Sequence, residues 1–351
     1  MSLTYSEETD LNNIRRLREM LKELPDYCAD FFRGIEPNTQ SRTRIAYAYD
    51  MKVFFNFLIN NNSYIKEKTS GDIKMITLDM LDALKPVDLE EYMDYLKYRD
   101  EEGREIYNKE WGIMRKLASL RSFYNYFYRI ERLDNNPTQR IKMPKLHDKE
   151  IIRLDVDEVA MMIDEAESGD ELTEAQQRYH KKTKTRDVAL LTLLLGTGIR
   201  VSECVGLNIS DIDFKNDGLR LHRKGGKEVT VYFGDEVEEA LKTYLEERKA
   251  MIPASGHEDA LFLSLQMKRL SVHSIQNLVK KYAKIVTPLK KITPHKLRST
   301  YGTNLYRETG DIYLVADVLG HADVNTTKKH YAALEDDRRR SARNVVKLRN
   351  D

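Results

Sequence analysis

Apolar residues recur at helical spacings through the first 130 positions of the chain, and this periodicity favours an assembly of helices in that half. One amphipathic helix is predicted over residues 38–60 and another over residues 111–130. A third is predicted between them, over residues 87–99, where acidic and apolar residues alternate. The aromatic stripe of the 111–130 segment is more typical of a buried core than of a base-stacking platform. We therefore predict a helical first half with no strand before residue 150.

A segment without clear periodicity, residues 134–150, separates this half from the rest of the chain. It contains Pro137 and Pro144 among several basic residues, a composition that predicts a linker. The basic residues suit a strap along a phosphate backbone, although a solvated hinge explains them equally well. A chain of 351 residues is long enough for two domains, so we expect a helical domain over 1–133 and a second domain over 151–351.

The second half changes its pattern partway along. Helical sequence runs through Leu195, is interrupted at Gly196 and Gly198, and resumes as a short helix over residues 201–207. Asn-Asp-Gly and Gly-Gly turns then separate three short apolar or alternating runs, which favours a small antiparallel sheet. These runs are residues 212–214, 219–222 and 229–233. Helices return after Asp235, so the predicted fold is mainly α with a small antiparallel β-sheet in the second domain.

Charge is distributed unevenly along the chain. The formal net charge is only +1, yet the segment from Ala260 through Arg307 contains no Asp or Glu. Acidic residues gather instead in residues 155–174 and 235–247. One face could therefore meet phosphates while another repels them, but a solvated lysine-rich surface would look the same in the sequence. The basic residues of the acid-free segment are Lys268, Arg269, Lys280, Lys281, Lys284, Lys290, Lys291, Lys296, Arg298 and Arg307.

Several classes of protein are disfavoured by composition. No apolar run approaches the ~20 residues that a membrane span needs. The polar, acidic start MSLTYSEETD does not resemble a secretory signal, so we expect a cytoplasmic protein without a membrane partner. Cys28 and Cys204 are far apart and form neither a disulfide framework nor a zinc site. Neither cysteine chemistry nor a bound metal is expected.

Candidate phosphate-binding residues stand at two predicted helix starts. Thr293 and Pro294 are suited to the cap and the first position of a helix, and His295 and Arg298 then share one of its faces. Together with the amides of the helix start, this pair can grip an anion. Arg200 follows a glycine-bounded turn and is either a phosphate clamp or a solvated helix cap. Surface helices often contain such residues, so neither feature is specific alone.

Three further candidates lie at ends of predicted elements. Lys224 is at the tip of the predicted strand pair, where it could reach a bound backbone or simply keep the hairpin soluble. His321 follows Gly320, which is expected to end a helix through a positive φ. Tyr331 lies in a short predicted helix that Asn325 would cap, and it is one of 20 tyrosines.

The order of these segments is more informative than any one of them. The segments TGIRVSE, RKGGKE, PHKLRST, LGHADV and NTTKKHY, in this order, resemble the catalytic boxes of tyrosine recombinases, the family of Xer-type resolvases and of phage and conjugative-element integrases. The resemblance covers the second half closely and the first half only through its helical character and basic linker. It implies a two-domain DNA clamp, in which a helical core-binding domain is joined to a catalytic domain.

The resemblance implies a role for each matched residue. Tyr331 would be the nucleophile and Glu203 a supporting residue that steadies the pocket. The residues around the scissile phosphate would be Arg200, Lys224, His295, Arg298 and His321. Two departures are present: Tyr331 lies one residue further from His321 than in Xer-type proteins, so that His330 occupies the usual position, and Ser299 replaces the second histidine of the HxLRH box.

These residue types suit metal-free DNA cleavage. Attack by tyrosine forms a 3′-phosphotyrosyl bond and frees a 5′-hydroxyl, so that rejoining needs no nucleotide cofactor. His295 is the candidate base, two arginine forks match the charge on the phosphate, and His321 would hydrogen-bond it. Lys224 would protonate the leaving oxygen, with Lys227 a weaker alternative. No paired carboxylates for magnesium occur in these boxes, so cleavage is expected to persist in EDTA.

The resemblance also implies partners. These are double-stranded DNA with paired recombination sites, further copies of the chain in a homotetramer, and accessory proteins such as a DNA translocase. The tail, residues 334–351, could pack on a neighbouring subunit. Tentative DNA contacts are Arg42, Arg44, Lys52, Arg115, Lys116, Arg140, Lys142 and Lys145.

Other functions remain open in the sequence. They are DNA relaxation like that of a type IB topoisomerase, and gene regulation by a DNA-binding protein that has lost the chemistry. Within the recombinases, chromosome dimer resolution and mobile-element integration or excision are both possible. The long segment before Asn38 favours a single-protein Xer-type system.

Overall fold

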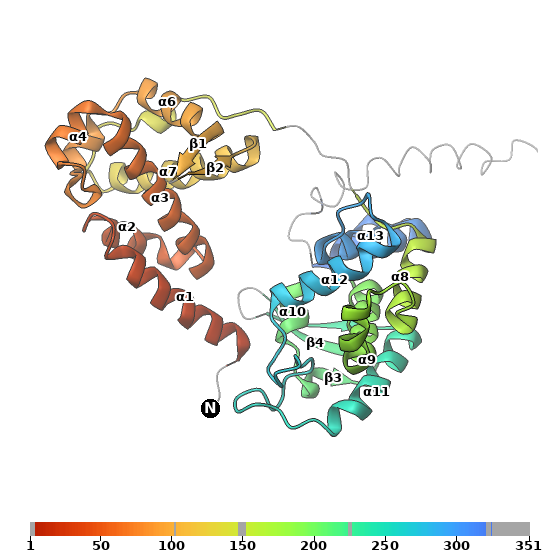
Figure 1. The fold of residues 1–351 in the computed structure, drawn as a ribbon. Helices are drawn as coiled ribbons and strands as arrows, with labels where there is room; N and C mark the ends of the chain where they lie inside the picture. Colours follow the sequence, from red (N-terminus) through yellow and green to blue (C-terminus); the bar gives the residue numbers. More distant parts are fainter. Residues whose placement is uncertain (1–3, 102, 147–151, 224–226, 321–323, 325–351) are drawn as a thin grey trace, which may run out of the picture. The chain divides into compact units, whose positions relative to one another are not determined.

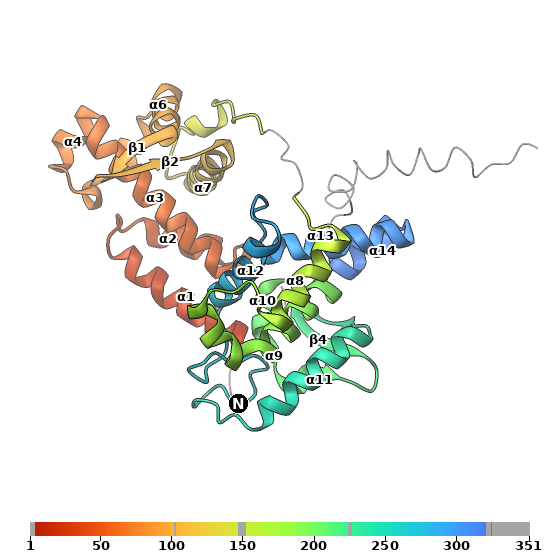
Figure 2. The same ribbon diagram turned by 45° about the vertical axis from the view of Figure 1, so that its right-hand side comes forward.

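The structure is a computed structural model that describes residues 4–101, 103–146, 152–223, 227–320 and 324. The chain divides into two compact units, Met1–Lys149 and Glu150–Asp351, which are described separately below. Figures 1 and 2 show their elements. No helix in the described ranges is both long enough and apolar enough to span a membrane.

Unit 1 is built mainly from helices, and the three that were predicted from periodicity correspond to α3, α6 and α7 (Figure 1). Their apolar faces enclose one aromatic core, in which Phe54 lies edge-on to Tyr92 and Phe123 lies edge-on to Phe127. The aromatic stripe of α7 thus belongs to the core, as predicted. The helices are α1 (Tyr5–Leu21), α2 (Cys28–Ile35), α3 (Ser41–Asn61), α4 (Ser63–Thr69), α5 (Leu78–Asp82), α6 (Pro86–Lys97) and α7 (Glu110–Arg129).

The prediction of no strand before residue 150 was wrong. Strands β1 (Tyr98–Glu101) and β2 (Arg104–Tyr107) pair antiparallel between α6 and α7. Gly103 turns the chain with a φ of +80°, and the Tyr98 and Tyr107 rings lie 5.1 Å apart. The strands have four residues each and are largely exposed and charged, so they lack the alternation of a half-buried strand.

The predicted linker begins later than residue 134, because its first part is folded onto unit 1. The Asn135 backbone N–H donates to Asp82 Oδ1 at 2.7 Å, and its side-chain amide donates to the carbonyls of Asp82 and Leu84. Ile141 is buried in the core. Hydrogen bonds between side chains and backbone hold this segment on unit 1. Because such contacts produce no apolar periodicity in the sequence, the segment was predicted as a linker.

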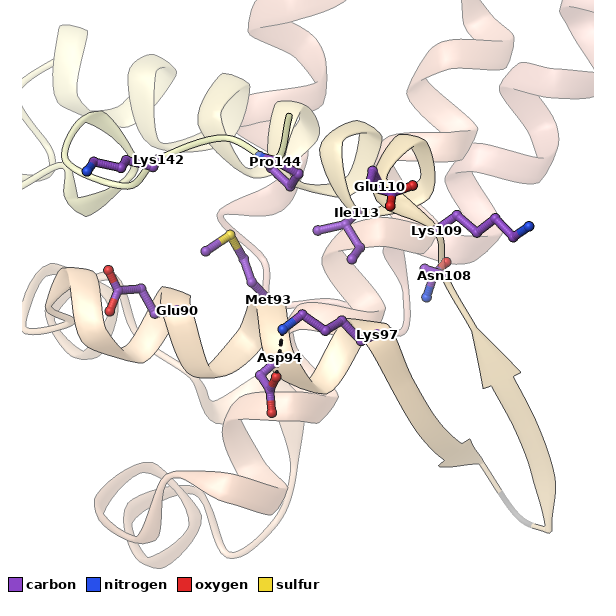
Figure 3. A pocket seen from close by; sticks show the side chains of 10 residues that line it. All are labelled: Glu90, Met93, Asp94, Lys97, Asn108, Lys109, Glu110, Ile113, Lys142 and Pro144. Carbon is purple, nitrogen blue, oxygen red and sulfur yellow. Dashed lines mark hydrogen bonds and ion pairs between the residues drawn. The ribbon is translucent and has the colours of Figure 1, made fainter. Parts of the chain in front are cut away.

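After Ile141 the chain passes over the start of α7. There Lys142 and Pro144 line a hollow of about 400 Å³ together with Met93 of α6 and Ile113 of α7 (Figure 3). Both lysines and carboxylates line it, and Lys97 is hydrogen-bonded to Asp94 at 3.0 Å. The mixed charge gives this hollow no preference for an anion.

Unit 2 is a layer of helices around α9, with a three-stranded sheet beside them. Helices α8, α11 and α13 all contact α9, and α13 lies against α14 (Figure 2). The strands are β3 (Ile212–Asp213), β4 (Gly218–Arg223) and β5 (Lys227–Tyr232), antiparallel in the order β3-β4-β5, which confirms the predicted sheet. The helices are α8 (Val156–Ser168), α9 (Glu174–Thr197), α10 (Val201–Gly206), α11 (Asp235–Lys249), α12 (Val272–Val286), α13 (Pro294–Thr309) and α14 (Ile312–Leu319).

Gly196 does not interrupt α9, contrary to the prediction. The helix continues to Thr197 and ends at Gly198, which has a φ of +63°. A Cβ at Gly196 would lie 2.5 Å from a methyl group of Val237, so this glycine allows α11 to approach α9 closely. Only Gly198 has the helix-ending role expected from sequence.

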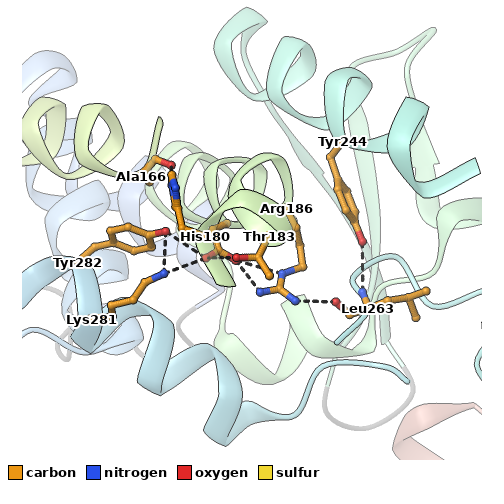
Figure 4. A network of polar contacts seen from close by, with 9 residues as sticks. Ala166, His180, Thr183, Arg186, Tyr244, Leu263, Lys281 and Tyr282 are labelled. Carbon is orange, nitrogen blue, oxygen red and sulfur yellow. Dashed lines mark hydrogen bonds and ion pairs between the residues drawn. The ribbon is translucent and has the colours of Figure 1, made fainter. Parts of the chain in front are cut away.

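A buried carboxylate, that of Asp187 on α9, joins the helices of unit 2. It accepts hydrogen bonds from Arg186 at 2.7 Å, from Lys281 at 3.2 Å and from the Tyr282 hydroxyl at 3.1 Å (Figure 4). Burial and the nearby Asp187 charge raise the pKa of Tyr282. Lys281 belongs to the acid-free segment, so one lysine of that segment stabilises the interior rather than the surface.

Candidate active site

Arg298 lies inside unit 2, with 4% of its surface exposed. Its Nη1 donates to the Gly198 carbonyl at 2.6 Å, and its Nη2 donates to the Leu319 carbonyl. One arginine on α13 therefore ties the end of α9 to the end of α14. The guanidinium is held in a fixed orientation by main-chain acceptors.

His295 lies one turn before Arg298 and is exposed. Thr293 precedes the helix in an extended conformation, as predicted, but its side chain makes no capping hydrogen bond, so Pro294 sets the helix start. The Ser299 hydroxyl donates to the His295 carbonyl at 3.1 Å. The serine that replaces the second histidine of the box thus bonds to its own helix.

Arg200 is held both through its backbone N–H and through its guanidinium group. Its backbone N–H donates to Glu203 Oε2 at 2.7 Å and its Nη1 donates to Glu203 Oε1 at 2.8 Å. Its Nη2 donates to the Gly320 carbonyl at 3.0 Å. With 40% of the side chain exposed, the guanidinium is both oriented and open to a ligand. Glu203, the predicted supporting residue, accepts both of the first two hydrogen bonds.

The end of α14 is the meeting point of these side chains. Arg200 and Arg298 donate to the consecutive carbonyls of Gly320 and Leu319, although they lie on different helices. Gly320 ends α14 with a φ of +61°, as predicted. Carbonyl groups at a helix end carry partial negative charge, which explains why arginines gather there.

Three predicted site residues, Lys224, His321 and Tyr331, lie outside the described residues, as does His330. Two of them follow directly in the chain after described residues at this site. His321 follows Gly320, whose carbonyl accepts from Arg200, and Lys224 follows Arg223.

Arg223 was missed by the sequence reasoning. It is the last residue of β4, its Nε lies 3.4 Å from Glu203 Oε1, and its Nη2 donates to the Val318 carbonyl at 3.4 Å. Strand alternation could have found it, because Leu219 and Leu221 are buried on the face of β4 that Arg223 shares. The basic tip sequence instead suggested a solvent-facing residue.

The tentative DNA contacts of unit 1 divide into buried and exposed residues. Arg44 is buried and pairs with Glu36 at 2.6 Å, and Lys116 is buried against Asp50 at 3.1 Å. Both are committed to carboxylates of unit 1, because a buried cation needs a partner. Arg115 also binds Asp50, and Lys52 pairs with Glu23. The exposed members are Arg42, Arg115, Arg140, Lys142 and Lys145, of which Arg115 is bound to Asp50.

The two cysteines lie in the interior, and burial raises the pKa of the Cys204 thiol to about 12. Within the ranges that the structure describes, no three His, Cys, Asp or Glu side chains are placed to hold a metal ion.

Known proteins resemble the chain over most of its length. Residues 153–338, just over half of the chain, match the Phage integrase family. The tyrosine recombinase XerC of Caldanaerobacter subterraneus subsp. tengcongensis is 37% identical, over 93% of this chain and 86% of that protein. The tyrosine recombinase XerD of Oceanobacillus iheyensis is 32% identical, over 80% of this chain and 92% of that protein.

Solved structures share the fold. A XerH site-specific recombinase bound to palindromic difH substrate matches with a TM-score of 0.67 at 18% identity, over 95% of this chain and 88% of that one. The Tn1549 transposon integrase in complex with transposon right end DNA matches with a TM-score of 0.63 at 18% identity, over 89% of this chain and 98% of that one. The predicted fold class, mainly α with a small antiparallel β-sheet in the second domain, is confirmed, and unit 1 adds the two-stranded sheet that was not predicted. The chain belongs to the Phage integrase family and is a tyrosine-type site-specific DNA recombinase.

Proposed function

We propose that the chain cleaves and rejoins DNA through a covalent 3′-phosphotyrosyl bond to Tyr331, with Arg200 and Arg298 holding the scissile phosphate. The observation that carries this proposal is the meeting of the two guanidinium groups at the end of α14, directly before His321 in the chain. Each of the two guanidinium groups donates to a main-chain carbonyl at this helix end, and Arg200 also donates to Glu203. A phosphate is a stronger acceptor for guanidinium than a carbonyl and can take over these donors.

In the proposed reaction each transferred proton has an assigned donor or acceptor, and one bond breaks as another forms. The Tyr331 oxygen attacks phosphorus and loses its proton to His295, directly or through water, while the bond from phosphorus to the 5′-oxygen breaks. Lys224 donates the proton that the leaving oxygen requires, and His321 hydrogen-bonds the phosphate. The reverse sequence, with a 5′-hydroxyl from the partner strand, rejoins the DNA without a cofactor.

The two arginines act on the charge that builds up on the non-bridging oxygens. Arg298 is rigid and buried, whereas Arg200 is oriented by Glu203 and partly open. Donors that are already in place when charge develops need no reorganisation, and each is typically worth ~100- to 1,000-fold in rate.

The exposed face of α12 supplies a DNA-binding surface in unit 2. It lies in the acid-free segment, and its exposed residues are hydrogen-bonding or basic. Such side chains suit contacts to phosphates and base edges. They are His273, Gln276, Asn277, Lys280 and Lys284. In unit 1 the exposed Arg42, Arg140, Lys142 and Lys145 take the phosphate-contacting role.

The biological role is the resolution of paired DNA sites by a Xer-type enzyme. The similarity to the XerC and XerD relatives extends through most of the chain, including unit 1, and supports this choice. Strand exchange requires a homotetramer on two DNA sites, in which residues 334–351 pack on a neighbouring subunit. The enzyme acts in the cytoplasm with accessory proteins such as a DNA translocase.

The first test is covalent trapping. A duplex selected by binding from a random DNA pool is nicked beside the cleavage position and incubated with protein in EDTA. Wild type should form a complex that survives SDS, and Tyr331→Phe should form none, because the attacking oxygen is missing. An adduct with both proteins would assign the nucleophile to another tyrosine. Loss of the wild-type adduct in EDTA would overturn the metal-free mechanism.

A further inference from the structure

The strand β4 brings a third arginine to the end of α14. Arg223 lies at the last position of β4, and its side chain is 12% exposed. Its Nη2 donates to the Val318 carbonyl, so three arginines donate to the three consecutive carbonyls of Val318, Leu319 and Gly320. The last carbonyls of a helix have no intrahelical partner, and here arginines from three different elements donate to them.

Arg223 also shares a carboxylate with Arg200. Glu203, with a side chain that is 7% exposed, lies 2.8 Å from Arg200 Nη1 and 3.4 Å from Arg223 Nε. The Arg223 Nε is buried and has no hydrogen-bond acceptor among the described residues. The contact with Glu203 is therefore an ion pair without hydrogen-bond geometry. Arg223 offsets the charge of Glu203 while Arg200 keeps the hydrogen bond.

The packing at Gly320 leaves room for the Arg223 side chain. A Cβ at Gly320 would collide with the Arg223 guanidinium, so the absence of a side chain at Gly320 lets Arg223 reach the helix end. Gly320 also needs its positive φ to end α14. The same glycine thus serves the helix end and the approach of Arg223.

We propose that Arg223 is a positioning residue for DNA cleavage, which shares Glu203 with Arg200 and so keeps the charge of Arg200 available to the scissile phosphate. Without Arg223, the carboxylate of Glu203 would be balanced by Arg200 alone, and a closed pair attracts an anion weakly. With Arg223 present, two guanidinium groups share the one carboxylate of Glu203, so one positive charge of this described triad is not balanced by it. This inference rests on the proposed phosphate-holding role of Arg200.

The test is single-turnover cleavage of the nicked duplex by Arg223→Gln. We expect the cleavage rate to fall about tenfold, less than the ~100- to 1,000-fold loss expected for a donor that touches the reacting phosphate. The Kd for DNA and the melting temperature should stay near the wild-type values. Arg223→Lys keeps the charge and should cleave faster than Arg223→Gln. Arg220→Gln is the matched control, because Arg220 lies on the exposed face of the same strand and should cleave like wild type.

A second substitution separates charge sharing from a purely structural role. Glu203→Gln removes the charge that Arg223 is proposed to offset but keeps an acceptor for the Arg200 backbone N–H. The variant Glu203→Gln/Arg223→Gln should therefore cleave faster than Arg223→Gln alone. A double variant as slow as the single one, or wild-type cleavage by Arg223→Gln, would overturn the inference.

The proposed role of Arg200 is tested separately, with Arg200→Ala. Arg200→Ala should cleave far more slowly than wild type. If it cleaves at the wild-type rate, the role of Arg200 is wrong and the inference about Arg223 falls with it. If Arg200→Ala is slow while Arg223→Gln is not, only the inference is overturned.

Discussion

Unit 1 and unit 2 each contain a carboxylate with cations around it, but the two clusters differ in which acceptors their hydrogen-bond donors occupy. In unit 1 the side chain of Asp50 is 0% exposed and receives two hydrogen bonds from Arg115, at 2.7 and 2.6 Å, and one from Lys116 at 3.1 Å. At the end of α14 in unit 2, Arg200 and Arg223 share the carboxylate of Glu203, and Arg200, Arg223 and Arg298 each donate to a main-chain carbonyl. The cations of the first cluster donate to a fully buried carboxylate, whereas the arginines of the second also donate to main-chain carbonyls that a phosphate can replace.

A structural cluster and a ligand site differ in whether their charged groups can still bind an anion. A buried carboxylate whose oxygens are all occupied holds helices together and has nothing left to offer an anion. Guanidinium groups that rest on main-chain carbonyls can exchange those acceptors for a phosphate. Asp187 in unit 2 follows the closed pattern, with Arg186, Lys281 and Tyr282 around it. Open and closed clusters therefore occur within one unit.

The largest expected effect is on the closed cluster of unit 1. Asp50→Ala leaves Arg115 and the buried Lys116 without their carboxylate, and breaking a buried pair in this way typically destabilises by ~3–5 kcal/mol. Denaturant unfolding should show this loss, whereas Asp26→Ala on an exposed loop should unfold like wild type. A loss below ~1 kcal/mol for Asp50→Ala, the range of exposed pairs, would show that the cluster is not closed.

Removing either of the two arginines proposed to hold the phosphate should slow cleavage strongly, with different effects on stability. Arg200→Ala and Arg298→Ala should each lower the single-turnover rate by ~100- to 1,000-fold, the usual effect of losing one oriented donor. Only Arg298→Ala should also lower the melting temperature, because its buried guanidinium bonds the Gly198 and Leu319 carbonyls. Equal losses of stability would contradict the difference in burial.

Gly320→Ala tests the approach of Arg223 with a smaller change. Alanine at a φ of +61° costs roughly 1–2 kcal/mol, and its methyl group must displace the Arg223 guanidinium. Both unfolding and cleavage should respond. Gly310→Ala is the comparison, since Gly310 also has a positive φ, of +71°, at the end of α13. If the two variants cleave equally well, the space around Arg223 has no effect on the reaction.

The smallest expected effect is at a partly exposed pair of unit 2. Burial would raise the pKa of Glu158, but hydrogen bonds from Lys290 and the Asp155 backbone outweigh it and lower the pKa. A lowered carboxyl pKa means that the stabilisation is present above the unfolded value near ~4.3 and is lost as the pH falls through the folded value. Lys290→Met should reduce the free energy of unfolding by only ~0.2–1 kcal/mol at pH 7.

The pH dependence supplies the control for this pair. At pH 3 the difference between Lys290→Met and wild type should shrink, because Glu158 is then increasingly protonated in both proteins. Lys291→Met, at the exposed neighbouring position, should match wild type at either pH. A difference that persists unchanged at pH 3 would assign the effect to packing of the lysine stem.

Much of the fold could be predicted, because apolar residues at regular spacing indicate which face of a helix or strand is buried. Helices α3, α6 and α7 and the three-stranded sheet follow from apolar spacing and turn residues. The hairpin of β1 and β2 could not be predicted, since its strands are short and exposed. Gly196 was misread for a related reason: a glycine inside a helix looks the same whether it breaks the helix or admits a neighbour such as Val237.

The sequence by itself determined the family, the order of the catalytic boxes and the residue types of the site, because these are properties of local chemistry along the chain. Only the tertiary structure decided which charges are paired. It committed Lys116 and Arg44 to carboxylates, brought Arg200 and Arg298 to one helix end, and added Arg223 to them. The reason is physical: the strength of an ion pair depends on distance and burial, and both are set by contacts between residues that are remote in sequence.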